Sequence, residues 1–370
     1  MLDPSTTEVI THIYQSSGFK GFAAHLSSRT ALTLAQNDNV AHVEQDQIYT
    51  ISATSQSSPP NWGLARICNR EKPNGFFDVN YNYDSKAGEG VDVYVVDTGI
   101  NVAHPEFKNK AKMVGNFIQD SPNMDENGHG THVAGIIGSS SYGVAKKVNL
   151  LGVKVLDAGG SGSTSGIIAA LDFIVQTVIK QKANAANARP AVINMSLGGS
   201  PSRALDNAVT SAFRANIPVI VAAGNEAQDA CGVSPAGGPE AFAVGNSNID
   251  DVRHRSSNYG KCVRLFAPGS NILSTYKNDV AKLTGTSMAS PHVAGVAALF
   301  LSNNPHISSG EVYDMLMSSA TPGQVSNIGP NSPNLLLYNI PRGSSDFVEY
   351  APRPEGKSID STPSWLQVPL

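Results

Sequence analysis

The stretch Gly285-Thr286-Ser287-Met288-Ala289-Ser290-Pro291 decides how the rest of the chain is interpreted. It predicts a sharp turn that presents Ser287 at the start of a helix, which the apolar run over residues 293–300 continues inward. Since a helix tolerates proline in its first turn, we expect Pro291 to lie there. Ser287 would then sit where unpaired N–H groups and the positive end of the helix dipole converge, a good place to stabilise an oxyanion. Most serines at helix starts are simple caps, so this turn alone does not identify a nucleophile.

The composition is that of a large folded chain with few charges. Its 370 residues allow one large or two modest domains, and a hydrophobic content of 41% is ample for a core. A net charge of -4 without a basic cluster gives no reason to expect a nucleic-acid partner. No apolar run is long enough to span a membrane, and residues 1–15 lack the apolar core of a signal peptide.

Three cysteines leave the redox compartment open. Cys231 and Cys262 flank a segment rich in glycine, proline and serine and could pair, which leaves Cys68 over. The alternative is three reduced cysteines, which the composition does not exclude.

Residues 1–52 are predicted to form a small unit of their own. Its predicted elements are strands at residues 12–14 and 18–26, a short capped helix at 27–35 and a strand at 40–51.

A polar segment follows this unit. Residues 53–61 have the composition of an exposed linker and are the expected boundary and cleavage site. At the other end of the chain, residues 341–370 are rich in proline, serine and charge and are predicted to be a disordered tail.

Between residue 62 and about residue 340, predicted strands and helices alternate. The strands cover residues 91–97, 149–156, 191–197 and 218–223, and the helices cover residues 130–138, 165–182 and 203–215. This alternation predicts an α/β fold, with a mostly parallel sheet covered by helices on both faces. Functional groups in such folds gather at the carboxyl ends of the strands.

Three residues that could form a catalytic set stand at the ends of predicted elements. Asp97 ends a strand before the turn Thr98-Gly99, His129 begins a helix, and Ser287 follows in the third motif. An imidazole can take the proton of a serine hydroxyl, and a carboxylate orients that imidazole. Taken singly, Asp97 could cap a turn, and His129 with His132 could hold a metal. The metalloprotease helix pattern with its glutamate is absent, however, and we expect His132 to pack in the core.

Four segments resemble the signature motifs of the subtilisin-like serine proteases. They are Asp97-Thr98-Gly99, residues 128–135 (GHGTHVAG), residues 285–291 (GTSMASP) and Ala222-Ala223-Gly224-Asn225. The resemblance covers roughly residues 62–339 and implies the three-layer subtilisin-like fold. It also implies Asp97, His129 and Ser287 as the catalytic triad. Asn225 and the backbone N–H of Ser287 are then the expected donors to the oxyanion.

Two segments match those along which the family binds an extended peptide substrate. They are Gly160-Ser161-Gly162 and Ser196-Leu197-Gly198-Gly199. Both lie at the ends of predicted strands and consist mostly of small residues, so that an extended peptide could bind between them as an additional strand. Ala222, Ala223 and Gly224 are expected to floor a roomy pocket for the residue before the scissile bond. These segments hold no acidic residue, which argues against selectivity for basic side chains. The alternative is that the glycines only permit tight turns.

Within the family, the likeness is closest to the fungal proteinase K type and especially to cerevisin. It is carried by residues 61–67 (NWGLARI), 222–231 (AAGNEAQDAC), 259–263 (YGKCV) and 266–269 (FAPG). Cysteines matching Cys231 and Cys262 are paired in that group, which implies an oxidising, secretory route.

Two positions depart from that pattern. Val133 stands where the cerevisin type often has a cysteine, so we expect reduced sensitivity to thiol reagents. Arg264 stands where a calcium-binding aspartate is frequent, so we expect no metal site there.

Residues 1–52 resemble the C-terminal half of the family's inhibitory propeptide, an α+β unit of ferredoxin-like topology. The likeness is strongest at residues 18–22 (GFKGF) and 43–46 (VEQD). The first strand and helix of that propeptide, and a signal peptide, are not recognised. We expect the segment to act as an intramolecular inhibitor that is removed by cleavage between about residues 50 and 60.

These observations predict a serine endopeptidase of broad specificity, made as a zymogen. We expect it to need no cofactor, to act as a monomer on proteins and peptides, and to reach the vacuole or the extracellular space. No nucleic-acid or membrane partner is expected. The rivals are an inactive subtilase fold kept as a binding protein, which the complete triad disfavours, and a narrow-specificity processing protease.

Overall fold

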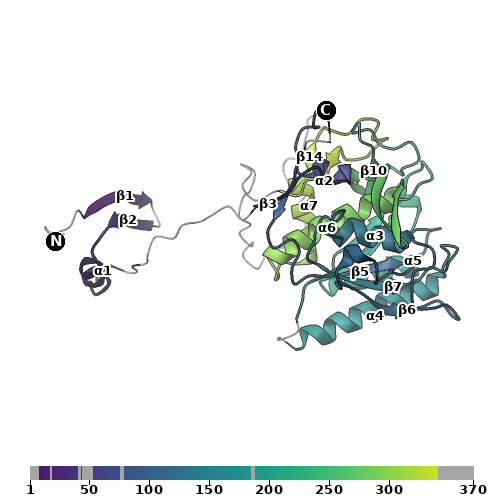
Figure 1. Ribbon diagram of the computed structural model, residues 1–370, viewed down its shortest axis with the longest axis horizontal. Coiled ribbons are helices and arrows are strands. Elements are labelled where there is room, and N and C mark those ends of the chain that lie inside the picture. The colour runs from purple at the N-terminus through teal and green to yellow at the C-terminus, as the bar shows by residue number, and fades with distance from the viewer. Residues whose placement is uncertain are drawn as a thin grey trace. The chain divides into compact units, whose positions relative to one another are not determined.

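In a computed structural model of the protein, the described residues are 8–16, 19–40, 43, 53–75, 79–184 and 188–340. The chain divides into two compact units, Met1–Ile51 and Ser52–Leu370 (Figure 1). Most of the predicted strand at residues 40–51 and all of the predicted tail at residues 341–370 lie outside the described residues.

The first unit is a two-stranded antiparallel sheet followed by a helix. β1 (Val9–Ser16) pairs with β2 (Phe19–His25), and α1 (Ser28–Ala35) follows. The Ser27 hydroxyl caps α1 by accepting a hydrogen bond from the N–H of Thr30, as the sequence predicts. No described side chain of this unit is buried, and the side chain of Ile13 is 66% exposed. The described part of the unit therefore has no core of its own and leaves apolar side chains available to a partner surface.

The second unit is built on one nine-stranded sheet, in which every neighbouring pair except β14–β15 is parallel. In spatial order its strands are β14 (Thr321–Pro322), β15 (Leu335–Leu336), β11 (Val263–Pro268), β10 (Phe242–Ser247), β9 (Val219–Ala222), β8 (Ala191–Met195), β5 (Asp92–Asp97), β7 (Asn149–Lys154) and β6 (Ala111–Asn116). The antiparallel pairs β3 (Ala53–Gln56) with β4 (Tyr81–Asp84) and β12 (Ile272–Tyr276) with β13 (Asp279–Leu283) form two small sheets of their own.

Helices cover both faces of the large sheet (Figure 1). One core lies against α2 (Trp62–Ile67), α3 (His129–Gly138), α6 (Thr286–Asn303) and α7 (Ser309–Ser319), and the other against α4 (Thr164–Lys182) and α5 (Arg203–Arg214). Alternate residues of a strand point to opposite faces, so Val93 and Val95 join the first core and Tyr94 and Val96 the second. The predicted α/β class and three-layer architecture are thus confirmed. Among the described helices, none has the length and apolar character that a bilayer span demands.

The starts of the helices follow local capping chemistry. The hydroxyls of Ser163, Ser202 and Ser308 each accept a hydrogen bond from a backbone N–H in the first turn of α4, α5 and α7. Glu311 completes a capping box with Ser308. The N-cap of α6 is Gly285, which has no side chain to offer. The first N–H groups of α6 are therefore left to partners from elsewhere in the fold or to a ligand.

Residues 53–56 differ from the expected linker, because they form β3 in the second unit. Their backbone pairs with β4, in register from Ala53 opposite Asp84 to Gln56 opposite Tyr81. The polar composition hid this strand, since a strand exposed to water needs no apolar side chains when its backbone is paired. The irregular part of the segment is confined to residues 57–61, just before α2.

The position of Pro291 also differs from the expectation. Because α6 begins at Thr286, Pro291 lies in its second turn rather than in its first. Proline there has no N–H to donate to the carbonyl four residues earlier, which is that of Ser287. The hydroxyl of Ser196, which follows β8, donates to this carbonyl instead, at 2.9 Å, and so replaces the helix hydrogen bond that Pro291 lacks.

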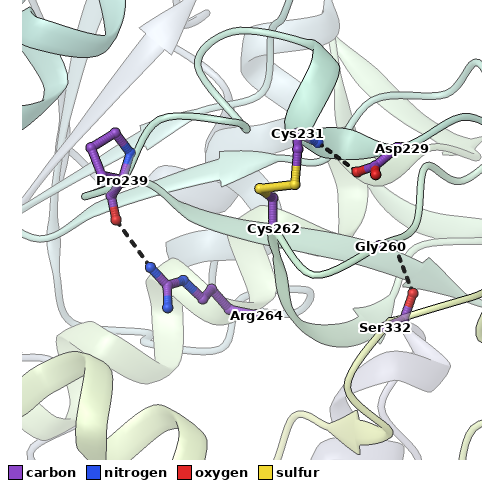
Figure 2. The surroundings of a disulfide bond; sticks show 7 residues. All are labelled: Asp229, Cys231, Pro239, Gly260, Cys262, Arg264 and Ser332. Carbon is purple, nitrogen blue, oxygen red and sulfur yellow. Dashed lines mark hydrogen bonds between the residues drawn. A yellow bond between two sulfur atoms is a disulfide. The ribbon is translucent and has the colours of Figure 1, made fainter. Parts of the chain in front are cut away.

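A disulfide joins Cys231 to Cys262, as the resemblance implies (Figure 2). The two cysteines are separated by 31 residues in the sequence. In the chain-entropy model, closing a loop of this length stabilises the folded state by about 3–4 kcal/mol. Cys68 is free and buried, and burial raises the pKa of its thiol to about 11. Cys68 is therefore a neutral, unreactive thiol at physiological pH.

Candidate active site

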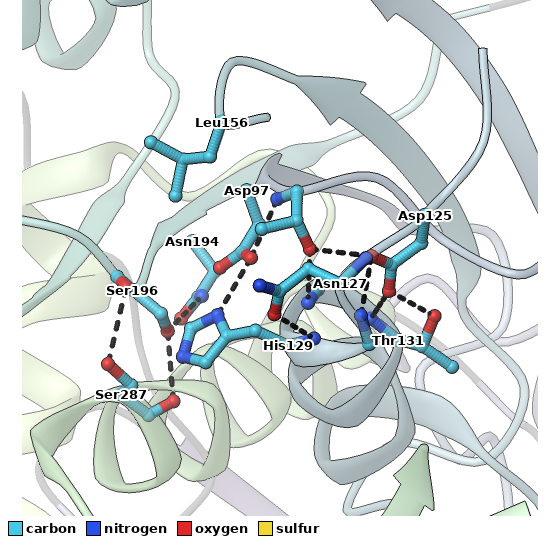
Figure 3. Close-up of polar contacts among 12 residues, drawn as sticks. Asp97, Asp125, Asn127, His129, Thr131, Leu156, Asn194, Ser196 and Ser287 are labelled. Atoms are coloured by element: carbon cyan, nitrogen blue, oxygen red, sulfur yellow. Dashed lines mark hydrogen bonds and ion pairs between the residues drawn. The ribbon is translucent and has the colours of Figure 1, made fainter. Parts of the chain in front are cut away.

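Asp97, His129 and Ser287 meet at the carboxyl end of the sheet (Figure 3). Asp97 is the last residue of β5, His129 is the first residue of α3, and Ser287 lies in the first turn of α6. Loops that follow parallel strands gather at this edge, which is where such folds hold their functional groups. The structure therefore brings together the three residues that the sequence motifs single out.

The Asp97–His129 pair is closely hydrogen-bonded. Nδ1 of His129 donates to Oδ1 of Asp97 at 2.8 Å, and the same oxygen accepts the N–H of Thr98 at 2.7 Å. The Asp97 side chain is fully buried, whereas that of His129 is 27% exposed. Because a carboxylate can only accept, the proton of the neutral imidazole lies on Nδ1. Nε2 then carries the lone pair that a general base needs.

Gly130 lets α3 approach the loop that follows Asp97. A Cβ at this position would lie 2.1 Å from the carbonyl oxygen of Gly99 and 3.1 Å from Oδ1 of Asp97. The N–H of Gly130 donates to Oγ1 of Thr98 at 2.9 Å, which ties the start of the helix to that loop. Any side chain at residue 130 would move the helix, and with it His129, away from Asp97.

The Ser287 hydroxyl is hydrogen-bonded to a neighbouring backbone carbonyl. Its Oγ donates to the backbone oxygen of Ser196 at 3.2 Å (Figure 3). Within the described residues, no hydrogen bond joins Oγ to His129. A rotation about the Cα–Cβ bond of Ser287 is therefore needed before Nε2 can take the hydroxyl proton, and such contacts commonly tighten only when substrate is bound.

The amide of Asn225 is held in one orientation. Its Oδ1 accepts hydrogen bonds from the N–H of Thr286 at 2.9 Å and from Oγ1 of Thr286 at 3.2 Å. These two donors fix Oδ1 toward α6, so Nδ2 is the atom left to donate to an incoming group. The preceding Gly224 has φ +102°, and a Cβ there would meet Nδ2 of Asn258 at 2.3 Å. Glycine is required at this turn because both the backbone conformation and the close approach exclude a side chain.

Asp125 is a site residue that the sequence reasoning missed. It is only 6% exposed, and its carboxylate joins the loop of Asp97 to the start of α3 (Figure 3). It accepts hydrogen bonds from Oγ1 of Thr98 at 2.8 Å, from the N–H of Gly128 at 2.8 Å and from the N–H of Thr131 at 2.9 Å. An acidic residue just before a predicted helix start was the available signal.

Two carboxylates act on the charge of His129. Burial alone would lower the pKa of this imidazole, but the charge and hydrogen bond of Asp97, with a further contribution from the charge of Asp125, raise it above its ordinary value of 6.5. A general base must be neutral to accept a proton. Activity that depends on His129 should therefore fall on acidification at a pH above 6.5.

Replacing Asp125 by asparagine is expected to shift the fall in activity on acidification, the acidic limb of the pH profile, to lower pH. The substitution removes a negative charge that favours the imidazolium, so the pKa of His129 falls. The check is the pH dependence of kcat/KM for wild type and Asp125→Asn. Glu89→Gln is a matched control, since Glu89 is exposed and precedes the opposite end of β5. A limb that stays in place in Asp125→Asn, or moves upward, would contradict the assignment.

A groove with a volume of about 820 Å³ runs beside His129. Its walls include both segments that the resemblance assigns to substrate binding. They are Gly160, Ser161 and Gly162, and Ser196, Leu197, Gly198 and Gly199. The remaining described lining residues are Thr98, Asn127, Leu156, Thr164, Ile167, Ser200, Pro201, Ser202, Leu205 and Ser234, with no acidic side chain among them.

Ala222, Ala223 and Gly224 are not among the residues that line this groove, and their expected role as the floor of the pocket for the residue before the scissile bond stays a prediction. Ala222, the last residue of β9, is 5% exposed, and Ala223, which follows it, is fully buried. Nδ2 of Asn258 donates to the carbonyl of Ala223 at 2.9 Å, and the N–H of Gly224 donates to Oγ1 of Thr286 at 3.2 Å. These bonds hold in place the turn that carries Asn225.

The other histidine of the second motif has a structural environment. His132 is fully buried, and its Nε2 lies 3.1 Å from the carbonyl oxygen of Ile272 and 2.9 Å from that of Ala281. Burial lowers its pKa to about 4, so the ring is neutral and joins α3 to the β12–β13 hairpin. Val133 beside it is also fully buried.

The surroundings of Arg264 do not fit a calcium ion. Its Nη2 donates to the carbonyl oxygen of Pro239 at 3.0 Å (Figure 2). The guanidinium charge thus occupies an oxygen that could otherwise be a calcium ligand, and it would repel the ion. In the part of the chain that the structure describes, no three histidine, cysteine or acidic side chains are grouped so that they could hold a metal.

Comparison with known proteins gives matches along nearly the whole chain. A sequence profile described as Subtilase family matches residues 88–335, and one described as Peptidase inhibitor I9 matches residues 3–52. The chain is 43% identical over 355 residues to alkaline serine exoprotease A of Vibrio alginolyticus, covering 93% of this chain and 64% of that protein. It thus spans slightly less than two thirds of that relative's length.

Two further matches cover their counterparts more fully. The extracellular serine proteinase of Thermus sp. strain Rt41A is 45% identical over 327 residues, which is 87% of this chain and 76% of that protein. Among solved structures, the crystal structure of a cold adapted subtilisin-like serine proteinase superposes with a TM-score of 0.70 at 45% identity. The superposition covers 75% of this chain and 98% of that one.

Proposed function

The chain belongs to the subtilase family of serine endopeptidases, and we propose that it hydrolyses proteins through Asp97, His129 and Ser287 with broad specificity, after release from an inhibitory first unit. The strongest support is the 2.8 Å bond from Nδ1 of His129 to Asp97 beside the nucleophile Ser287. The complete set of groups, with Asn225 oriented by Thr286, argues against an inactive binding protein.

Acylation uses the free lone pair of His129. Ser287 rotates away from the carbonyl of Ser196, and Nε2 accepts its proton as Oγ attacks the scissile carbonyl. Asp97 keeps Nδ1–H in place and stabilises the imidazolium that forms. The imidazolium gives its proton to the leaving amine. Water then attacks the acyl-enzyme by the same route, with His129 again as the base.

The negative charge that develops on the carbonyl oxygen needs donors that are already in position. Asn225 supplies Nδ2–H and Ser287 supplies its backbone N–H at the uncapped start of α6. Both contacts strengthen only as the oxyanion forms, so they lower the barrier rather than tighten the binding of substrate.

The substrate is an extended peptide that adds as a strand between residues 160–162 and residues 196–199. Backbone hydrogen bonds of this kind do not depend on sequence, and the described groove wall has no acidic side chain to select a basic residue. Broad specificity is the consequence.

A library of peptides that differ at the residue before the scissile bond tests this breadth. We expect kcat/KM to vary gradually among apolar and uncharged side chains. No preference for arginine or lysine is expected, since no described carboxylate lines the groove. Cleavage restricted to one sequence, at a rate far above all others, would favour a processing protease instead.

The first unit is the inhibitor of the second. The inhibitor profile covers residues 3–52, and the described part of the unit exposes Ile13 and Leu32 with no buried core. Cleavage falls between about residues 50 and 60. Because β3 pairs with β4, we expect the cleaved peptide bond to lie before Ala53, so that the mature enzyme keeps β3. The mature enzyme comprises residues up to about 340, followed by the tail.

The protein travels through the secretory pathway to the vacuole or the extracellular space. The Cys231–Cys262 disulfide favours an oxidising compartment, and the Thermus relative is named as extracellular. Likeness to the proteinase K type, and to cerevisin within it, rests on the disulfide together with the segments around residues 61–67 and 222–231. The enzyme acts as a monomer without a cofactor.

A further inference from the structure

The helix that carries Ser287 lacks one of its own hydrogen bonds. In a regular helix the N–H of residue 291 would bond to the carbonyl of residue 287. Pro291 has no N–H, and it lies inside α6 rather than at its start. The carbonyl of Ser287 therefore depends on a donor from outside the helix.

Ser196 supplies that donor and also binds the side chain of Ser287. Its Oγ donates to the carbonyl oxygen of Ser287 at 2.9 Å, while its own carbonyl accepts the Ser287 hydroxyl at 3.2 Å (Figure 3). Ser196 follows β8 directly and is only 4% exposed. One residue just beyond the end of β8 thus contacts both the backbone and the side chain of Ser287.

The direction of the first bond follows from counting protons. A serine hydroxyl has one hydrogen to donate and two lone pairs to accept with. Nδ2 of Asn194 donates to Oγ of Ser196 at 3.0 Å, and a carbonyl such as that of Ser287 can only accept. The single hydrogen of Ser196 is used on Ser287, so in the 3.0 Å contact with Ser290 the Ser290 hydroxyl is the donor. Asn194 and Ser290, both fully buried, thereby aim the Ser196 proton at Ser287.

We propose that Ser196 is a positioning residue for the nucleophile: its hydroxyl replaces the helix hydrogen bond that Pro291 removes, and so fixes the backbone about which Ser287 rotates. The inference rests on the proposed catalytic role of Ser287. The Ser287 hydroxyl must leave the Ser196 carbonyl to reach His129, but the bond to the Ser287 backbone persists during that movement. Since Ser196 also lines the groove, the nucleophile is held by the same segment that borders the substrate.

A pair of substitutions on the full chain tests this exchange of donors. Ser196→Ala is expected to lower kcat about tenfold with little change in KM, and to slow labelling by a fluorophosphonate by a similar factor. Pro291→Ala alone is expected to have a small effect. In the double variant the new N–H at residue 291 can bond to the Ser287 carbonyl, so most of the lost kcat should return.

Ser302→Ala is the matched control. Its hydroxyl also donates to a carbonyl of α6, that of Leu299 at 2.9 Å, but it lies near the far end of the helix. It should leave kcat and labelling unchanged, in single form and with Pro291→Ala. A loss in Ser196→Ala that Pro291→Ala does not restore would overturn the inference, as would no loss at all.

Thermal unfolding of the same variants separates this inference from the proposed function. The fall in Tm caused by Ser196→Ala should be smaller in the Pro291→Ala background than in wild type, whether or not the chain is active. A wild type that neither reacts with the probe nor hydrolyses peptides would reject the proposed function. Additive changes in Tm would reject the donor exchange.

Discussion

Replacing Ser287 by alanine should lower kcat by about 10⁶-fold, the largest single effect that the structure leads us to expect. The substitution removes the atom that forms the acyl bond, and no other group of the proposed triad can replace it as the nucleophile. This magnitude is the one measured in subtilisin. Peptide turnover at saturating substrate measures it. The circular dichroism of the variant should match that of wild type, because Ser287 makes one side-chain contact that alanine loses.

The same variant should keep its first unit. If the catalytic residues cut the chain between about residues 50 and 60, Ser287→Ala remains at full length during expression and storage. Addition of active wild type should then restore cleavage. A Ser287→Ala chain that loses its first fifty-odd residues unaided would mean that another protease performs the maturation.

Replacing Asn225 by alanine should lower kcat by about 10²–10³-fold, with KM nearly unchanged. Nδ2 of Asn225 is kept available because Oδ1 is bonded to both the N–H and the hydroxyl of Thr286. The contact exists only when the carbonyl oxygen becomes an anion, so its loss affects the barrier and not the binding of substrate. This range too comes from measurements on a subtilisin.

Asn225→Asp separates the donor from the packing of the side chain. It keeps the size and an oxygen for Thr286 but has no N–H, and it adds a negative charge beside the oxyanion. We expect a loss at least as large as that of Asn225→Ala. A loss confined to KM in either variant would show that Asn225 binds substrate and does not stabilise the oxyanion.

Short-range patterns predicted most of the fold and the three central residues. The strand ending at Asp97, the helix starting at His129 and the turn before Ser287 each combine small residues with a functional one. Glycine at residue 130 is needed where a helix approaches a loop, and glycine at residue 224 where φ is positive. Such requirements act within a few residues, which is why they are visible in a single sequence.

Features that depend on distant partners could not be predicted. Residues 53–56 look like a linker until β4 pairs with them. Pro291 could be misplaced by a turn because its missing hydrogen bond is supplied by Ser196, 91 residues away along the chain from Ser287. The role of Asp125 likewise depends on its bond to Thr98, 27 residues away.

Intact mass spectrometry of the purified full chain after exposure to a fluorophosphonate reports both the loss of the first unit and the reactivity of Ser287. We expect a chain that has lost its first fifty-odd residues and carries one adduct, which peptide mapping assigns to Ser287. Ser287→Ala should carry none. A folded wild-type chain that takes up no label, or takes it up at a serine other than Ser287, would show that Ser287 is not the nucleophile.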